Sequence, residues 1–260
     1  MLRGLWSAAS GMAAQKLNID VIANNLANVN TAGFKKSRTD FQDLMYQTVD
    51  EAGSTTSTGE QIPVGIQVGM GTMPVDVHKV FIQGDFQETK NELDMAIEGK
   101  GFFKVLSGSE ERYTRAGNFK LDSNGNIVTP NGDKLQPEMT VPTDTSSIKI
   151  DADGTVTAFD SQGTGTALGT IEMYSFPNPA GLFSCGHNLY QATDASGAAV
   201  SGTAGSEGIG TISQGYLEVS NVDVVQEMVD MIMAQRAYEV NSKAIKTADD
   251  MMSIVNNISR

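Results

Sequence analysis

Both ends of the chain carry apolar side chains at helical spacing, and this pattern limits the possible folds more than any other feature. Between Leu5 and Leu26, small or apolar residues recur every three or four positions, with one polar break at Lys16. This is the spacing of one face of an α-helix, and of an a/d seam between paired helices. The pattern predicts a helix of about 26 residues. Gly33 is placed to end or turn the chain after it.

The C-terminal segment shows a second, longer stripe that begins at Val222 and continues to Val255. Its frame slips near Arg236, as happens when a helix of 3.6 residues per turn meets a seam of period 3.5, or at a true stutter. Ser220 or Asn221 is a suitable N-cap. We therefore expect a second long helix that can pair with the first.

The middle of the chain, residues 31–215, is rich in Gly, Thr, Ser, Asp and Asn, and its apolar runs are short. Tight turns are predicted at Asn-Gly pairs 124–125 and 131–132, and a further turn at 151–154. Residues 95–105 are expected to form a strand pair around a glycine-rich bend. These signals are typical of β-structure inserted between two helical ends.

We therefore expect an α+β fold in which long N- and C-terminal helices pair as a coiled coil around an inserted β-rich middle domain. The expected domains are a discontinuous helical polymerisation domain, an extended arm and an outer β-domain. The arm contains a loop-like stretch, Tyr46–Val68, with a flexible Gly/Ser/Thr centre at Gly53–Gly59. The domain ranges are 1–34 with 216–260, 35–71, and 72–215.

Composition excludes several classes of partner. The net charge of −13 makes nucleic acid and anionic membranes poor partners. No apolar run approaches the length of a membrane span, so we expect no membrane insertion. The first 15 residues resemble a signal peptide superficially, but polar residues interrupt them and the apolar stripe continues beyond any cleavage point. We interpret them as part of the mature chain.

The sequence offers little chemistry, and we expect no catalytic residue, cofactor or metal. His78 and His187 are far apart in sequence, and Cys185 is the single cysteine. No GxGxxG, GxSxG, CxxC or HExxH pattern occurs. The segments 122–125 and 151–154 resemble calcium loops faintly, but neither has the twelve-residue frame with a closing glutamate, so hairpin turns are favoured. A hydrolase hidden in the β-domain remains an alternative.

The terminal stripes favour assembly. Ordering about 75 terminal residues costs very roughly 75–150 kcal/mol of backbone entropy. Burying about fourteen seam side chains returns only very roughly 20–40 kcal/mol. Residues 1–40 hold five basic and two acidic residues, whereas residues 216–260 hold four basic and seven acidic ones. Opposite charge favours packing of one end on the other, within or between copies. We expect the ends to order fully only when copies of the chain pack together.

Several motifs resemble those of the flagellar axial proteins, the rod, hook and hook-associated subunits. The N-terminal block reads ANNLANVNTAGFK from Ala23 to Lys35. A central block runs from Gln83 to Phe103, followed by YTRAGNF from Tyr113. The C-terminal block has QGYLEVSNVD and MAQRAYE. The resemblance covers nearly the whole chain and is weakest at 140–210 and in the 46–68 loop.

Within that family the length and the 46–68 insertion are most similar to the distal rod subunit, with a proximal rod or hook-type subunit as the alternative. The resemblance implies a helical tube that transmits motor torque, with proximal rod subunits below, hook subunits above and the P- and L-ring proteins around it. It implies a location in the basal body, in the periplasm and through the outer-membrane rings. It also implies export through the flagellar type III apparatus without a cleaved leader.

The amides of the N-terminal motif are expected to bond across helices and set their register, as a polar a-position does. A secreted β-rich adhesin with a helical stalk is the alternative from a different class, and it predicts a discrete oligomer. The 46–68 arm is expected to bridge neighbouring copies and stiffen the tube. The candidate subunit-interface residues are Leu5, Met12, Ile19, Asn24, Asn25, Leu26, Asn28, Gly33, Phe34, Val225, Val229, Ile232, Tyr238, Ile245, Met252 and Val255.

Overall fold

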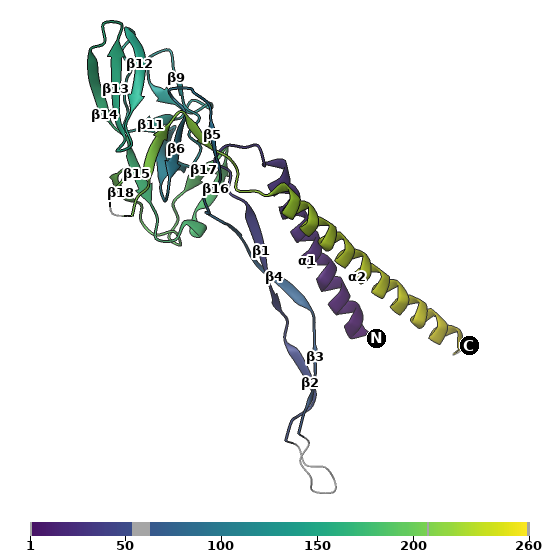
Figure 1. Cartoon of the computed structure of the whole chain (residues 1–260). Coiled ribbons are helices and arrows are strands. Elements are labelled where there is room, and N and C mark those ends of the chain that lie inside the picture. Colours follow the sequence, from purple (N-terminus) through teal and green to yellow (C-terminus); the bar gives the residue numbers. More distant parts are fainter. Residues whose placement is uncertain (1, 54–62, 207, 259–260) are drawn as a thin grey trace. The chain divides into compact units, whose positions relative to one another are not determined.

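The chain has a long helix at each end and β-structure between them, as a computed structural model shows (Figure 1). The structure describes residues 2–53, 63–206 and 208–258. The expected α+β class is therefore confirmed. The predicted flexible centre of the arm falls mainly at 54–59, outside the described residues.

Two compact units divide the chain, and each is discontinuous in sequence. One contains both helices and the strands nearest the N-terminus, and we call it the helical unit; the other, the β-unit, contains most of the strands. The helical unit comprises Met1–Leu26, Ser37–His78 and Val224–Arg260, and the β-unit comprises Ala27–Lys36 and Lys79–Asp223.

The helical unit combines two helices with two antiparallel ribbons. Strand β1 pairs with β4, and β2 pairs with β3 in an antiparallel register that places Tyr46 opposite Gly69. The stretch 46–68, expected to be loop-like, is therefore partly a two-stranded ribbon. The elements are α1 (Leu2–Ala27), β1 (Ser37–Asp43), β2 (Tyr46–Asp50), β3 (Ile66–Gly69), β4 (Thr72–Lys79) and α2 (Val224–Ile258).

Helix α1 has the 26 residues that the stripe predicts, and it ends before the turn at Gly33. Alanine is frequent and proline is absent in it, which favours the helix. Gly33 adopts φ +69°, a value that suits glycine in a turn. A Cβ on Gly33 would lie 2.6 Å from the backbone nitrogen of Ala116, so a larger residue would not fit.

Helix α2 begins at Val224, three residues later than the expected Asn221 cap. The side chain of Asn221 makes other bonds. Its oxygen accepts from the backbone nitrogen of Lys36 at 2.8 Å, and its amide nitrogen donates to the carbonyls of Val80 and Ile82 at 2.9 and 3.1 Å. The cap prediction is wrong because this amide joins three segments of the β-unit.

The β-unit is built from antiparallel pairs. Its largest sheet follows the order β16-β17-β8-β7-β11-β10-β9, with β15 attached to β7 and β18 attached to β15; a three-stranded sheet is β12-β13-β14. Two short ribbons join distant segments, β19 with β6 and β20 with β5. Its elements are β5 (Phe86–Glu88), β6 (Met95–Glu98), β7 (Phe102–Ser107), β8 (Glu110–Thr114), β9 (Lys120–Leu121), β10 (Ile127–Val128), β11 (Lys134–Gln136), β12 (Thr145–Ile150), β13 (Thr155–Asp160), β14 (Gly165–Thr170), β15 (Glu172–Ser175), the 3-10 helix η1 (Pro179–Gly181), β16 (Phe183–Gly186), β17 (Leu189–Gln191), β18 (Val200–Thr203), β19 (Thr211–Gln214) and β20 (Tyr216–Glu218).

Strand β7 separates two apolar clusters, because successive side chains of a strand point to opposite faces. Phe103 and Val105 enter the larger cluster. Phe102 enters a mainly aromatic cluster with Tyr113 and Tyr190. Phe102 and Tyr190 lie 6.0 Å apart between ring centroids in a T-shaped arrangement. The β-unit therefore has a core that needs no helix to complete it.

The predicted turns at 124–125, 131–132 and 151–154 are confirmed, and each has a glycine with positive φ at its end. They join β9 to β10, β10 to β11 and β12 to β13. The predicted strand pair within 95–105 is wrong in its pairing. Both strands exist, but β6 pairs with β19 and β7 pairs with β8, β11 and β15, because the bend carries the chain from one sheet to another.

Candidate assembly surface

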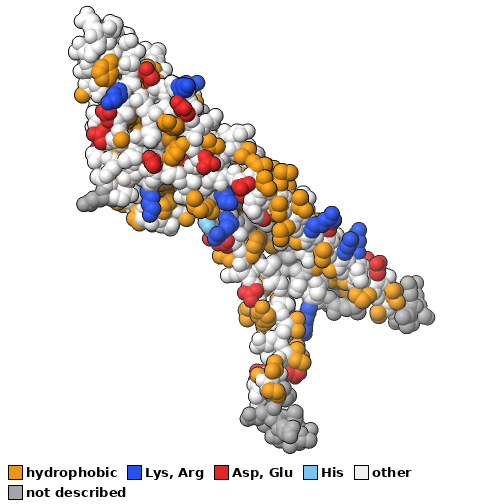
Figure 2. Space-filling model, in the orientation of Figure 1, with side chains coloured by type: hydrophobic (Ala, Val, Ile, Leu, Met, Phe, Trp, Pro, Cys, Tyr) orange, Lys and Arg blue, Asp and Glu red, His pale blue; other side chains and the backbone are white. Residues whose placement is uncertain are grey.

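An apolar stripe on the exposed side of α2 is the main candidate for a functional surface. Val225 is 72%, Val229 46% and Ile232 55% exposed. Met228 and Met233 are also exposed and extend the stripe. Figure 2 shows hydrophobic side chains gathered along this part of α2. A soluble chain rarely leaves such a row open unless another surface covers it.

The other side of α2 is covered, and its inward residues include small, charged and larger apolar ones. Ala234 is buried, and Ile245 and Met252 are half-buried. Glu227, a carboxylate, is also buried. The slip near Arg236 falls between the exposed seam positions 225, 229 and 232 and the half-buried seam positions 245 and 252. The first half of the predicted seam lies on a different face of the helix from the second half.

Helices α1 and α2 contact each other at two separate places on their inward faces. The Asn25 amide donates to the Glu227 carboxylate at 3.1 Å. Further along, Gly11 faces Asn241 so closely that a Cβ on Gly11 would lie 2.8 Å from the Asn241 amide nitrogen. The Asn25 amide also bonds both backbone groups of Ser37, at 2.8 and 2.9 Å. This single amide therefore connects α1, α2 and the start of β1.

The predicted seam of α1 lies at the margin of its covered face. Leu5, Met12, Ile19 and Leu26 are all half-buried. The most buried positions of α1 are instead Ala8, Ala14, Val21, Ile22 and Asn25. One reason is that α1 also contacts the β1–β4 ribbon, where the Ser10 hydroxyl accepts from the backbone nitrogen of Thr72 at 3.3 Å. The remaining face of α1 is exposed and rich in alanine, with Trp6 68% exposed near its start.

The other candidate residues fall into two groups. Tyr238 and Val255 on α2 are exposed, and Asn24 is exposed on α1. Asn28 is half-buried, whereas Gly33 and Phe34 are buried in the β-unit. Phe34 has the Lys79 ammonium 4.6 Å above its ring. The residues named as candidates are therefore partly surface and partly internal.

Exposed apolar residues also line the two ribbons of the helical unit. Met45 is 86% exposed, and Tyr46, Val49, Val64 and Ile66 are exposed beside it. Further apolar positions on β4 are open as well. A two-stranded ribbon has no core of its own and is marginal in isolation. The two ribbons are therefore a second surface that a neighbouring chain could cover.

Sequence reasoning missed a buried charge cluster in the β-unit, formed by Lys35, Arg115 and Glu218. The Lys35 ammonium donates to Glu218 Oε1 at 2.6 Å, and Arg115 Nε donates to Glu218 Oε2 at 2.5 Å. All three side chains are at least 94% buried. Lys35 lies in the first sequence segment of the β-unit and Glu218 lies near the end of its last segment, so the cluster joins these two segments within the unit. The motifs contained all three residues, but spacing gave no signal that they meet.

The charges of this cluster support one another. Burial alone would raise the pKa of Glu218, but Arg115 and Lys35 outweigh it and hold the pKa below its ordinary value of 4.5. Burial lowers the pKa of Lys35 from 10.5 against the attraction of Glu218. The backbone nitrogen of Gly84 also donates to Glu218 Oε1 at 2.9 Å. Glu218 is therefore an ionised carboxylate that holds several elements together.

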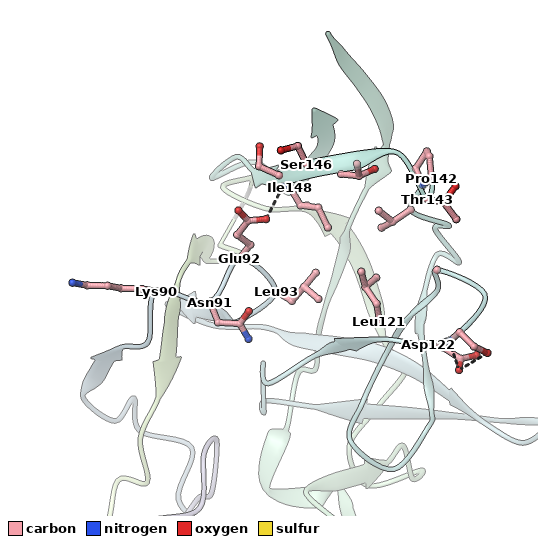
Figure 3. A pocket seen from close by; sticks show the side chains of 15 residues that line it. Lys90, Asn91, Glu92, Leu93, Leu121, Asp122, Pro142, Thr143, Ser146 and Ile148 are labelled. Atoms are coloured by element: carbon pink, nitrogen blue, oxygen red, sulfur yellow. Dashed lines mark hydrogen bonds between the residues drawn. The ribbon is translucent and has the colours of Figure 1, made fainter. Parts of the chain in front are cut away.

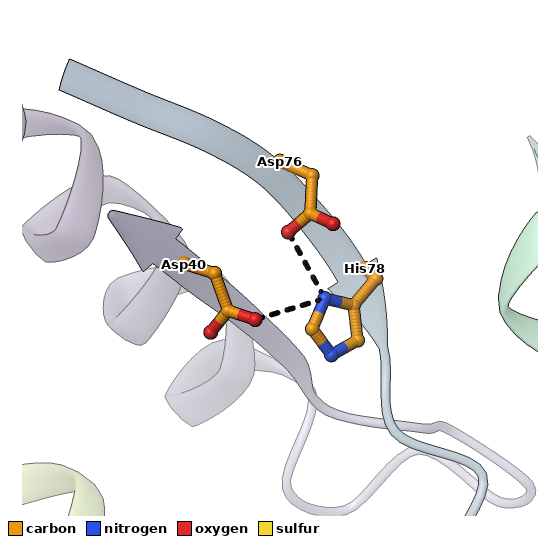
Figure 4. A group of neighbouring side chains, drawn as sticks. All are labelled: Asp40, Asp76 and His78. Carbon is orange, nitrogen blue, oxygen red and sulfur yellow. Dashed lines mark hydrogen bonds and ion pairs between the residues drawn. The ribbon is translucent and has the colours of Figure 1, made fainter. Parts of the chain in front are cut away.

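One group of side chains on the β1–β4 ribbon could offer metal ligands (Figure 4). His78 Nδ1 lies 3.1 Å from Asp76 and 3.9 Å from Asp40. However, Arg38 bonds both oxygens of Asp40, at 3.0 and 3.1 Å. Hydrogen bonding to Arg38 also lowers the pKa of the Asp40 carboxyl. This arrangement is explained as an exposed ion-pair network, and we assign no metal to it.

A cavity of about 490 Å³ in the β-unit is open to solvent, and both polar and apolar residues line it. Its lining includes Glu92, Leu93, Leu121 and Ile148 (Figure 3). The Glu92 carboxylate accepts from the backbone nitrogen of Ile148 at 2.8 Å, so it serves the backbone. The turn residue Asp122, at the other side, accepts bonds from Ser123 and Asn124. The Ser123 hydroxyl also donates to Asp122 Oδ1 at 3.3 Å, which is a local bond of this exposed turn.

The geometry thus defines a class: a structural subunit with a self-sufficient β-unit and helix faces left open for other chains. Three family models match the chain: "Flagella basal body rod protein" at residues 5–35, "Flagellar hook protein FlgE/F/G D1 domain" at 96–158 and "Flagellar basal body rod FlgEFG protein C-terminal" at 213–258. The chain belongs to the flagellar basal-body rod protein family.

Curated relatives agree over the full length. The flagellar basal-body rod protein FlgG of Borreliella burgdorferi is 49% identical, with all of both chains covered. FlgG of Caulobacter vibrioides is 46% identical over 99% of each chain, and FlgG of Bacillus subtilis is 39% identical over all of both. The chain is a structural subunit and not an enzyme, so the adhesin and hydrolase alternatives are wrong. Among the described residues, no helix is both long and apolar enough to span a membrane.

Proposed function

We propose that the chain builds the distal part of the flagellar rod by polymerising through its terminal helices into a helical tube that transmits torque. The observation that carries the proposal is the apolar stripe of α2, where Val225, Val229 and Ile232 remain about half exposed or more. The full-length similarity to proteins named FlgG supports a rod role over a hook role.

The free energy gained by covering the stripe explains why a polymer is favoured over a dimer. The exposed parts of the five stripe residues (Val225, Met228, Val229, Ile232 and Met233) amount to about three whole side chains, and covering them would contribute roughly 4–9 kcal/mol. Association of two chains costs roughly 4–15 kcal/mol in lost freedom. One such contact cannot hold a dimer firmly. A subunit that gains several neighbours at once offsets that cost, so assembly should be nucleated and cooperative.

The surfaces differ in kind, which suits packing between unlike faces. The open face of α1 is small and alanine-rich, whereas the open stripe of α2 has branched and sulfur-containing side chains. Small residues allow close approach of a partner helix. The basic excess of the N-terminal end and the acidic excess of the C-terminal end favour the same pairing. Contacts that do not close on themselves generate helical filaments.

In this proposal the other partners follow from the family. Proximal rod subunits lie below, hook subunits above, and P- and L-ring proteins around the tube, in the periplasm and through the outer membrane. The type III apparatus exports the chain without leader cleavage. The expected domains 1–34 with 216–260, 35–71 and 72–215 act as polymerisation domain, arm and outer domain. The exposed ribbon of residues 46–68 would bridge copies and stiffen the tube.

Electron microscopy of the purified chain at rising concentration tests the proposal. Straight tubes or filaments should appear above a threshold concentration, and dilution should dissolve them. A stable discrete oligomer over the whole range would contradict it. Deleting residues 46–68 should leave tubes that bend more easily, measured as a shorter persistence length. Unchanged bending would remove the stiffening role of the ribbon and leave the tube itself in place.

A further inference from the structure

A second, smaller cavity in the β-unit touches the buried charge cluster. Its volume is about 140 Å³, and Lys35 and Arg115 both line it. Its walls include the aromatic rings of Phe81, Phe102 and Phe176. Such walls keep the local dielectric low, so charges at the cavity interact more strongly than at an open surface. The cavity is large enough for a few non-hydrogen atoms but not for a cofactor.

Charge is unbalanced at this place. Two buried cations, Lys35 and Arg115, share the single carboxylate of Glu218. Lys100, exposed at the rim, adds a third positive charge to the lining. Backbone carbonyls supply the other acceptors, but they carry only partial charge. A buried cation without a full counter-charge is costly, so an anion would be stabilised here.

Donors also exceed acceptors. The ammonium of Lys35 has three N–H bonds, and within the described chain it donates to two acceptors, Glu218 Oε1 and the carbonyl of Ile82. Arg115 has five N–H bonds. Four of them are used, by Glu218 and by the carbonyls of residues 97, 99 and 101. One N–H on each cation therefore has no acceptor among these bonds of the described chain, and both cations line the cavity.

We propose that this cavity is a carboxylate site, in which one carboxylate accepts from Lys35 and Arg115 against the aromatic wall. The carboxylate comes either from a small anion in solution or from an Asp or Glu side chain of a neighbouring copy. The excess of acidic residues in the chain provides many candidates for the second source. The site is independent of the helix stripe, because all of its residues lie in the β-unit.

The first experiment uses the dilute full chain, with sodium acetate as the probe. Thermal unfolding of the β-unit is followed by near-ultraviolet circular dichroism of its clustered tyrosines, with sodium chloride replacing acetate at constant ionic strength. Ligand that binds only the folded state raises the melting temperature. Acetate should raise it and chloride should not. An equal response to both salts, or none to either, would overturn the proposal.

Three variants test whether acetate binds in this cavity. Lys35→Met removes one cation and should weaken acetate binding about tenfold or more, because a charge-assisted hydrogen bond is lost. Ser175 also lines the cavity, and Ser175→Leu should fill it and abolish the acetate response while the charge cluster stays intact. Lys134→Gln, at an exposed ion pair on β11, is the matched control and should respond like the wild type. If Ser175→Leu responds fully, the anion binds elsewhere and the proposal fails.

A second experiment distinguishes a small free anion from a neighbour's side chain as the source of the carboxylate, and it does not decide whether the site exists. Polymer yield of concentrated wild-type chain is measured by pelleting in acetate and in chloride. A lower yield in acetate, absent in Ser175→Leu, assigns the site to a neighbour's carboxylate. Equal yields assign it to a small free anion. Failure of the chain to polymerise would count against the proposed rod function alone, because the first experiment uses dilute protein and does not require polymer.

Discussion

Replacing Glu218 with glutamine is expected to destabilise the β-unit strongly. The carboxylate accepts three bonds, from the Lys35 ammonium at 2.6 Å, Arg115 Nε at 2.5 Å and the Gly84 nitrogen at 2.9 Å. Its side chain is fully buried. Glutamine keeps one acceptor oxygen but turns an NH₂ group toward a cation and removes the negative charge. Breaking one partner of a buried ionic cluster costs about 3–5 kcal/mol.

Urea unfolding monitored by near-ultraviolet circular dichroism would measure this loss. Tyr113, Tyr174 and Tyr190, which pack in the aromatic cluster of the β-unit, contribute to this signal. The free energy of unfolding should fall by about 3–5 kcal/mol in Glu218→Gln. The matched control is Glu138→Gln, which breaks an exposed ion pair with nitrogen and oxygen 3.3 Å apart. That variant should change the free energy by less than about 1 kcal/mol.

The two variants must differ for the reasoning to stand. If Glu218→Gln stays within about 1 kcal/mol of the wild type, the cluster does not hold the first and last segments of the β-unit together, and the cost of a buried unbalanced charge has been misjudged. If both variants lose stability equally, the loss reflects net charge and not the buried geometry.

Three further predictions concern other contacts. Asn25→Ala should lower the melting temperature of the helical signal in far-ultraviolet circular dichroism, at a cost of about 2–4 kcal/mol, because the buried Glu227 carboxylate loses that donor; an unchanged melt would show that the amide is dispensable. Gly117→Ala should lower the urea midpoint of the β-unit, since its Cβ would lie 1.6 Å from the carbonyl oxygen of Met95 and force the backbone to move; a wild-type midpoint would contradict this. Because the pKa of Glu218 is lowered in the folded state, its stabilising contribution is complete above about pH 4.5 and is lost as the pH falls through the lower folded pKa. Acid unfolding of the wild type and of Glu218→Gln would measure this loss. Parallel unfolding curves for the two proteins would refute the prediction.

Regular features of the fold could be predicted from the sequence. The stripe from Leu5 to Leu26 marks a helix because periodicity is a local property, and the Asn-Gly pairs mark turns because glycine tolerates positive φ. The face that each helix buries could not be predicted in the same way. Glu227 lies inward although it is charged, while Ile232 lies outward although it is apolar. A carboxylate can be inward only because a partner such as the Asn25 amide satisfies it.

The buried charge cluster was beyond sequence reasoning for a related cause. Lys35 and Glu218 are 183 positions apart, and each looks like an ordinary surface charge by residue type. Only the pairing of chain segments across the β-unit brings them together. The same holds for Asn221, which looks like a helix cap but bonds two other segments, at Lys36 and at residues 80–82. Polar residues with non-local partners are where a pattern-based prediction fails.

The central claim is that the open apolar stripe of α2 drives polymerisation, and sedimentation of two aspartate variants tests it most directly. Ile232→Asp places a charge in the stripe, and Thr247→Asp places the same charge on an exposed polar part of α2. At a concentration where wild-type chain pellets as polymer, Ile232→Asp should remain in the supernatant with an unchanged β-unit signal, and Thr247→Asp should pellet. Normal pelleting of Ile232→Asp would contradict the claim.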